Sequence, residues 1–434
     1  MLTARYIRDN LDAIRKSLEK RHSDYPLNEL LSLDEQSRKV NKELQELRAE
    51  HNKGSEQISE MKKAGKQHDE QLVKKLADVK KRIDNLENSI PKQEERLQEL
   101  LWSMPNILDE SVPVGGPPEA NKVIKTWGKP MPRKIPTHEE ILGKLNMLDI
   151  ERARKTTGAR FYFMKGDLVL LELSLMRYVL DLLTKRGYTP VLPPFMLKKK
   201  YYKGAAPLAT FEDALYRVGE PEEASKLKEV EHVEDELFLI GTAEHALATM
   251  HAEEVFSISD LPIKYAGISP CFRREAGAHG KDTKGMFRVH QFDKIEQFIY
   301  CKKEDEQKYF DELLGNTEKI WQELNIPYQL VLLCSEDTGH QMTKTVDIEC
   351  YMPGQKAYRE LGSCSSAGVW QSMRLDMKYD EKQERKYVYT LNNTAVPAQR
   401  ALVCIVENYV NNDGTITVPD VLVPYMGKSK IGSK

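Results

Sequence analysis

The sequence predicts an α+β protein in which a long antiparallel helical hairpin precedes a domain built on an antiparallel β-sheet flanked by helices. Apolar residues recur at heptad spacing between about residues 28 and 104, where glycine and proline are scarce. Beyond residue 136, short β-rich runs alternate with helical patterns. A stretch rich in Pro and Gly separates the two patterns, so we expect an N-terminal domain over 1–110, a linker over 111–135 and a larger domain over 136–434.

Composition narrows the class of protein. The chain has 434 residues and a formal net charge of -2, so any contact with nucleic acid must come from local basic patches. No apolar run is long enough to span a bilayer and the start lacks the apolar core of a signal peptide, so we expect a cytoplasmic protein without membrane attachment. The six cysteines form no paired C-x-x-C motifs, and no structural zinc site is expected.

The arm is predicted from two heptad series on either side of a short turn that contains Gly65. The first series comprises Leu33, Val40, Leu44 and Leu47. The second comprises Leu72, Leu76, Val79, Ile83, Leu86, Ile90, Leu97, Leu101 and Met104. Pro91 interrupts the second helix and is expected to kink or break it. Such an arm can serve dimerisation or spacing, or it can probe an extended RNA, and periodicity alone leaves both uses open.

Residues 271–296 offer a set of side chains suited to phosphate and base recognition. We expect a strand ending near Arg274, a glycine-containing loop, and a second strand from Met286 to Glu296. Alternation then places Arg273 and Glu275 on one face of the first strand. It places Arg288, His290, Phe292 and Glu296 on one face of the second. Guanidinium groups fit phosphate oxygens, although an ordinary charged hairpin would have the same residues. Since no G-x-x-x-x-G-K-[ST] loop is present, ATP would be bound by side chains on a sheet.

These residues carry a resemblance to a known class of enzymes. Phe272-Arg-Arg-Glu275 resembles motif 2 of the class II aminoacyl-tRNA synthetases, and the segment ending at Pro194 resembles motif 1, with that proline at a homodimer interface. Ala395 to Arg400 resembles motif 3. Within the class, the arm and the segments 242–244, 288–296, 359–365 and 390–394 are similar to seryl-tRNA synthetases. The resemblance implies that 136–434 is a class II catalytic domain, which activates L-serine with ATP and loads it onto tRNA-Ser, with tRNA-Sec left open as a second acceptor.

The resemblance also implies a role for each site residue. Catalysis would depend on Arg273, Glu275 and Arg400. Serine would be bound by Thr242, Ala243, Glu244, Arg273, Glu296, Asn392 and Thr394. ATP would be bound by Arg273, Arg274, Glu275, Val289, His290, Gln291, Phe292, Glu360, Leu361, Gly362, Ser363 and Arg400. Mg²⁺ would be held by the oxygen ligands of Glu360 and Ser363. The loop 276–285, with Lys281 and Lys284, would contact the acceptor stem, and the arm would grip the tRNA by its shape.

Four positions depart from the family pattern: Gly241 replaces a proline, Met373 an arginine and Lys378 an arginine, and Pro91 lies inside the arm. Of these, only Met373 and Gly241 leave room for a catalytically impaired paralogue that acts as a tRNA- or protein-binding module. A ligase domain acting on a carrier protein is a third reading, which the intact arm disfavours.

Overall fold

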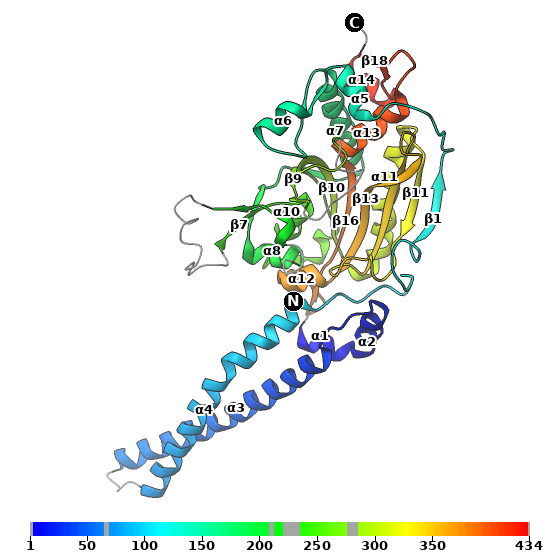
Figure 1. Cartoon of the computed structure of the whole chain (residues 1–434). Helices are drawn as coiled ribbons and strands as arrows, with labels where there is room; N and C mark the ends of the chain where they lie inside the picture. The colour runs from blue at the N-terminus through cyan, green and yellow to red at the C-terminus, as the bar shows by residue number, and fades with distance from the viewer. Residues whose placement is uncertain (1–2, 65–68, 208–211, 220–234, 276–284, 433–434) are drawn as a thin grey trace. The chain divides into compact units, whose positions relative to one another are not determined.

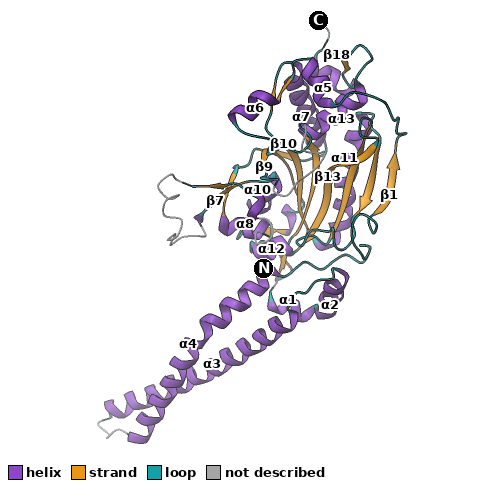
Figure 2. Cartoon of the chain, viewed as in Figure 1, coloured by secondary structure: helices purple, strands orange, loops and turns teal. Residues whose placement is uncertain are grey.

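The computed structural model describes residues 3–64, 69–207, 212–219, 235–275 and 285–432 (Figure 1). The chain divides into two compact units, one of Met1–Leu18 and Ser23–Met104, the other of Glu19–His22 and Pro105–Lys434. The first unit is helical, and the second contains the strands (Figure 2). No helix in the described ranges is long and apolar enough to cross a membrane.

The first unit contains two short helices followed by the predicted hairpin. Its helices are α1 (Ala4–Asp9), α2 (Leu11–Lys20), α3 (Leu27–Lys63) and α4 (Glu70–Ser103). Ion pairs join Arg82 to Glu43 and Lys75 to Glu50 at 2.5 and 2.6 Å. Because residue numbers fall along α4 as they rise along α3, the two helices are antiparallel, as predicted. These pairs are exposed, so each contributes at most about 1 kcal/mol.

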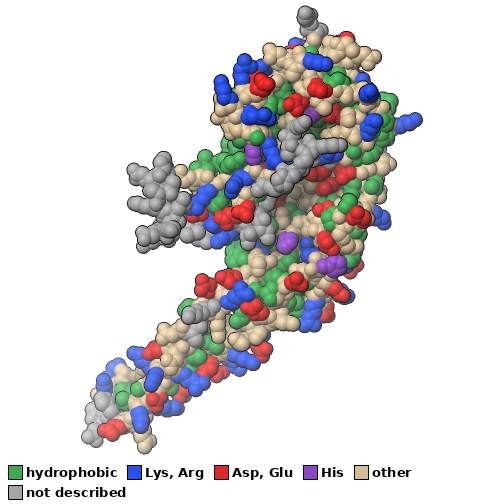
Figure 3. All heavy atoms as spheres, viewed as in Figure 1, with side chains coloured by type: hydrophobic (Ala, Val, Ile, Leu, Met, Phe, Trp, Pro, Cys, Tyr) green, Lys and Arg blue, Asp and Glu red, His purple; other side chains and the backbone are tan. Residues whose placement is uncertain are grey.

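Heptad packing holds the hairpin together. Leu44, Leu76 and Val79 are each less than one-tenth exposed. Gly54 faces Leu76 so closely that a Cβ at position 54 would lie 2.6 Å from a Leu76 methyl group, which brings the two backbones together. On the face of the arm that Figure 3 shows, Lys, Arg, Asp and Glu side chains lie along its length among other side chains. Helix α4 continues through Pro91 as one helix, so the predicted break is wrong.

An eight-stranded sheet organises the second unit, in the order β1-β11-β12-β13-β16-β10-β9-β4. Neighbours pair antiparallel except β4 and β9, which are parallel. This confirms the predicted fold class. The strands are β1 (Lys122–Trp127), β4 (Thr189–Val191), β9 (Ile263–Phe272), β10 (Gln291–Cys301), β11 (Tyr328–Leu332), β12 (Lys344–Met352), β13 (Ala357–Gly368) and β16 (Tyr389–Pro397).

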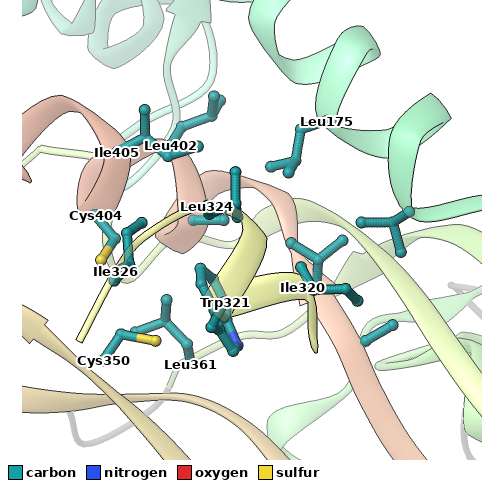
Figure 4. Close-up of a cluster of buried hydrophobic side chains, with 14 of the residues drawn as sticks. Leu175, Ile320, Trp321, Leu324, Ile326, Cys350, Leu361, Leu402, Cys404 and Ile405 are labelled. Atoms are coloured by element: carbon teal, nitrogen blue, oxygen red, sulfur yellow. The ribbon is translucent and has the colours of Figure 1, made fainter. Parts of the chain in front are cut away.

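The two faces of the sheet have different roles. On one face lies a core shared with helices α7 (Asp167–Lys185), α11 (Glu306–Glu323) and α13 (Ala398–Tyr409), where Trp321, Leu402 and Leu175 meet (Figure 4). On the other face lie α8 (Lys199–Ala205), α10 (Ala243–Thr249) and α12 (Trp370–Arg374). Strand β10 contributes to both, because alternate side chains point to opposite faces.

The remaining elements are short. The helices are α5 (His138–Lys144), α6 (Ile150–Thr156) and α14 (Val423–Met426). The strands are β2 (Leu148–Asp149), β3 (Phe163–Met164), β5 (Met196–Lys198), β6 (Arg217–Val218), β7 (Leu237–Leu239), β8 (Val255–Ser257), β14 (Lys378–Glu381), β15 (Glu384–Tyr387), β17 (Ile416–Thr417) and β18 (Lys430–Ile431).

Two predicted strand placements are wrong. The first strand ends at Phe272 as β9, so Arg273 and Glu275 lie beyond it. The strand expected from Met286 begins at Gln291 as β10, and residues 286–290 form no strand. Their backbone bonds go elsewhere: Met286 N donates to a histidine ring, and His290 N donates to Arg160 O at 3.1 Å. Contacts distant in sequence therefore override the local alternating pattern.

Candidate active site

The sheet brings the predicted residues together by register. Glu296 on β10 lies opposite Thr394 on β16 and opposite Gly267 on β9. Helix α10 follows Thr242, whose hydroxyl accepts a hydrogen bond from Glu244 N at 3.2 Å and so caps the helix. Helix α13 follows β16 directly and carries Arg400. Segments separated by about 150 residues of chain therefore meet on one face of the sheet.

Glu296 is the centre of a buried polar cluster. Its carboxylate accepts hydrogen bonds from the hydroxyls of Thr242 and Thr394, each at 3.4 Å, and forms an ion pair with Lys294. Lys294 Nζ also donates to Thr394 Oγ1 at 3.3 Å. Glu296 is 1% exposed and Lys294 is 5% exposed. A charge so deeply buried is tolerated because it is paired and hydrogen-bonded.

Glu244 lies beside this cluster with a perturbed acidity. Burial, followed by repulsion from Glu296, raises the pKa of Glu244 to about 7, and Lys294 partly opposes this shift. Gln371 Nε2 donates to Glu244 Oε1 at 3.1 Å. Because the raised pKa disfavours the ionised form of Glu244, a cation that binds beside this carboxylate stabilises it. The ammonium group of an amino acid is such a cation.

Asn392 supplies a further polar group. It lies two residues before Thr394 on β16, so both side chains face the same side of the sheet. Its Nδ2 is buried and has no hydrogen-bond partner among the described residues. A buried donor without a partner costs free energy, and a ligand hydroxyl or carboxylate would satisfy it.

Arg273 connects this cluster to a neighbouring pocket. Its Nε donates to Gly241 O at 3.1 Å, and its Cζ lies 5.3 Å from the centroid of the Phe292 ring. The chain around it is fixed because His290 Nδ1 donates to Arg273 O at 2.8 Å. Gly241 N in turn donates to the Tyr202 hydroxyl at 3.2 Å, a bond that a proline at 241 could not make. Glycine at position 241, where the family pattern has proline, is therefore compatible with an ordered site.

The pocket is lined by charged and aromatic side chains, together with a few apolar ones. Its lining consists of Arg273, Glu275, Phe287, Arg288, Val289, Phe292, Lys294, Glu360, Leu361, Gly362, Thr394, Pro397, Gln399 and Arg400. Arg400 pairs with Glu360 at 3.1 Å, and its Cζ lies 5.1 Å from the centroid of the Phe287 ring. The Glu275 carboxylate accepts from Arg288 Nε, while its backbone adopts a φ of 47°, uncommon for a residue with a side chain.

Not every residue expected to bind ATP lines this pocket. His290, Gln291 and Ser363 lie outside the lining, although each neighbours residues that belong to it. Arg274 lines a different hollow with Tyr216 and Arg217, and its backbone N donates to Ala214 O at 2.9 Å. The predicted loop contact of Lys281 and Lys284 lies outside the described residues.

The donor set beside Glu360 suits a hard cation. Ser363 lies opposite Asp347 of β12, and Asp347 Oδ1 is buried with no hydrogen-bond partner among the described residues. Burial and the nearby Glu360 carboxylate raise the pKa of Asp347. Within the described ranges no group of three or more His, Cys, Asp and Glu side chains could hold a metal by itself. Mg²⁺ needs only one or two carboxylates when substrate phosphates complete its coordination, so these residues fit that ion.

Several functional residues were missed from the sequence. Lys294 lies between Phe292 and Glu296 at the same two-residue spacing, so strict alternation would have included it. Phe287 and Gln399 line the pocket, and Gln371 bonds Glu244. No local pattern distinguishes these three from ordinary core or surface residues.

Comparison with known proteins places this site in a class. A family model described as tRNA synthetase class II core domain (G, H, P, S and T) matches residues 226–409. A second model, described as Seryl-tRNA synthetase N-terminal domain, matches residues 1–108. Fold and site thus define a class II aminoacyl-tRNA synthetase.

Relatives identify the family within that class. The serine–tRNA ligases of Methanocella arvoryzae and Cenarchaeum symbiosum are each 41% identical, over 98% and 99% of this chain and 99% and 100% of theirs. The crystal structure of seryl-tRNA synthetase from Pyrococcus horikoshii complexed with ATP matches with a TM-score of 0.89 at 39% identity, covering 99% of both chains. The cytoplasmic serine–tRNA ligase of Naegleria fowleri in complex with AMP matches at 0.84 and 36%, covering 97% of this chain and 95% of that one. The chain belongs to the seryl-tRNA synthetase family.

Proposed function

We propose that this protein activates L-serine with ATP, giving seryl-adenylate and pyrophosphate, and then transfers serine to the 3′ end of tRNA-Ser. The position of Arg273 carries the proposal. This side chain reaches from Gly241, beside the carboxylate cluster, to Phe292 in the pocket, so one guanidinium group can bind both reactants. A planar fork of donors suits a serine carboxylate and an α-phosphate together. Holding the two anions side by side overcomes their repulsion and the entropy of bringing them together.

The buried cluster is the serine pocket in this proposal. Glu244 and Thr242 meet the ammonium group, while Glu296, Thr394 and Asn392 meet the hydroxyl. Ala243 is buried at the start of α10 and contributes shape. Alanine would leave these polar groups unpaired, and this selects serine over alanine.

The pocket is the ATP site. Phe292 stacks on adenine, Glu275 accepts its amino group beside Val289, and Arg400 binds the γ-phosphate. The ion pair of Arg400 and Glu360 holds the two groups in place before ATP arrives. With ATP bound, Arg400 would pair with phosphate, and Glu360 and Ser363 would hold Mg²⁺. The metal would neutralise phosphate charge there.

We further propose that the arm binds tRNA-Ser by shape and that the protein is a homodimer. Leu173 on α7 and Leu192 beside Pro194 are 62% and 74% exposed, and β4 is an edge strand of the sheet. Exposed apolar side chains next to a sheet edge favour burial against a second copy. Leu173→Glu would then yield a monomer in analytical ultracentrifugation. All six cysteines are free thiols, which fits a cytoplasmic protein.

Pyrophosphate exchange tests the activation step. Wild-type protein should exchange pyrophosphate into ATP with serine and not with alanine or threonine. Arg273→Ala should abolish exchange, whereas Arg274→Ala should retain most of it because that side chain lines another hollow. Exchange with alanine but not serine would disprove the specificity.

Aminoacylation tests the arm. Deletion of residues 28–104 should leave serine-dependent exchange intact, which also shows that the second unit is folded, and should abolish charging of purified tRNA-Ser. If the full-length and deleted forms charge tRNA-Ser equally, the arm is not needed for charging and this proposal is wrong.

A further inference from the structure

His138 lies outside every motif and outside the pocket lining, yet it contacts the chain that forms the pocket. It is the first residue of α5 and is 7% exposed. Its Nε2 accepts a hydrogen bond from Met286 N at 3.2 Å. Because a backbone N–H can only donate, Nε2 carries no proton and the ring proton is on Nδ1.

Glu407 accounts for this tautomer. It is 2% exposed, its Oε2 accepts from Gly354 N at 3.0 Å, and its Oε1 lies 3.8 Å from His138 Nδ1. A buried carboxylate facing Nδ1 favours a proton there. Glu407 also lies two helical turns beyond Arg400 on α13, so one face of this helix serves both the pocket and the histidine.

The approach of the chain to the ring is unusually close. Gly285 has a φ of 68°, and a Cβ at this position would lie 2.0 Å from His138 Nε2. Only glycine fits there, both for its backbone angle and for the space. The path of the chain entering Met286 is therefore fixed by the imidazole.

The residues that follow form one wall of the pocket. Phe287 O accepts from Arg400 Nε at 3.4 Å, and the Phe287 ring lies 4.8 Å from Arg359 Cζ. Arg288 binds the Glu275 carboxylate. The serine cluster, in contrast, lies on β10, β16 and α10 and has no hydrogen bond to residues 285–288 within the described part of the chain.

We propose that His138, oriented by Glu407, is a positioning residue for ATP: it anchors Gly285 and Met286 so that Phe287, Arg288 and Arg400 are held in their binding arrangement. This inference rests on the proposed function in taking the pocket as the ATP site. Neither His138 nor Glu407 contacts substrate in this proposal. Its effect should be selective, since the serine cluster does not depend on this segment.

Steady-state pyrophosphate exchange by the full-length variants tests the inference. His138→Leu removes the acceptor at similar size and should raise the KM for ATP about tenfold, as expected for one lost hydrogen bond, with the KM for serine within about twofold. His138→Gln retains an acceptor oxygen and should restore most of the ATP affinity. Glu407→Gln presents an amide to Nδ1, favours the other tautomer and should resemble His138→Leu. His251→Leu is the matched control, because His251 bonds Tyr265 and Glu254 away from the pocket.

Calorimetric titration with a non-hydrolysable ATP analogue gives a second readout without turnover. Weaker analogue binding by His138→Leu and restored binding by His138→Gln would support the proposal. Equal increases in both KM values, an unchanged KM for ATP, or a glutamine variant as impaired as the leucine variant would overturn it. A wild-type protein that shows no serine-dependent exchange but binds the analogue would count against the proposed function and leave this test intact.

Discussion

Lys294 and Glu296 lie two residues apart on β10 and form a buried ion pair on the face of the sheet that carries the candidate active site. The pair does more than balance charge. Lys294 also lowers the pKa of Glu244, which burial and Glu296 raise. The Lys294 ammonium group therefore pairs with the Glu296 carboxylate and favours the ionised form of Glu244, and both carboxylates can then attract a cationic substrate.

Replacing Lys294 should affect both stability and serine binding. Lys294→Met leaves the Glu296 carboxylate buried and unpaired, and we expect the free energy of unfolding to fall by about 3 kcal/mol. The KM for serine should rise at least about tenfold, because Glu244 loses the ammonium group that lowers its pKa. Chemical denaturation and exchange kinetics measure the two effects. Lys303→Met, at an exposed position, is the control. A variant as stable as wild type would contradict the role of the pair.

Serine affinity should depend on pH through Glu244. Its pKa of about 7 in the free protein means that the carboxyl group is mostly protonated below pH 7, and an ammonium group binds the ionised form. Affinity for serine should thus be full above pH 7 and fall as the pH drops through 7, by about tenfold per unit below it. Calorimetric titration of serine between pH 6 and 8 measures this, and binding of an ATP analogue serves as the comparison. A serine affinity that stays flat over this range would refute the assignment.

Removal of the Asp347 carboxylate, whose Oδ1 has no hydrogen-bond partner among the described residues, should weaken the binding of Mg²⁺. Asp347→Asn keeps the shape of the side chain but removes a carboxylate oxygen that could ligate a cation beside Glu360 and Ser363. The Mg²⁺ concentration for half-maximal exchange should rise about threefold to tenfold. Mn²⁺ binding in the presence of an ATP analogue, followed by electron paramagnetic resonance, gives a readout independent of turnover. Asp376→Asn, at an exposed position, should leave both unchanged.

Glu172 should make stability depend on pH. Burial raises the pKa of Glu172 to about 7, with Asp293 adding to the shift, while Gln399 Nε2 donates to Glu172 Oε1 at 2.7 Å. The folded pKa lies above the unfolded one, so the stabilisation is complete below about pH 4.5 and is lost as the pH rises through 7. Between pH 5 and 8, the free energy of unfolding of Glu172→Gln should fall by about 2 kcal/mol less than that of the wild type. Urea denaturation at both pH values measures it, with exposed Glu151→Gln as the control. Parallel declines in wild type and Glu172→Gln would exclude Glu172 as the cause.

Strands were predictable where β-rich runs are bounded by turns, and less so elsewhere. Two of the β-rich runs beyond residue 136, those that begin at Ile263 and Tyr328, form strands β9 and β11. Strands β12 and β13 were not predicted, although apolar and polar residues alternate over residues 346–350 of β12. Strand β13 contains two glycines and several serines over residues 362–368, which give little local preference for a strand, and it forms because β12 and β16 pair with it on its two sides.

The sequence by itself determined the hairpin arm, since heptad spacing is a local property of a helix, and the alternation that places Phe292 and Glu296 on one side of a strand. Only the tertiary structure decided which groups meet there. The register between β10 and β16 sets Thr394 against Glu296, and the packing of α5 and α13 places His138 and Glu407 behind Met286. Such contacts join residues that are about 100 or more positions apart. Local spacing cannot encode them, because they depend on how separate elements pack into one core.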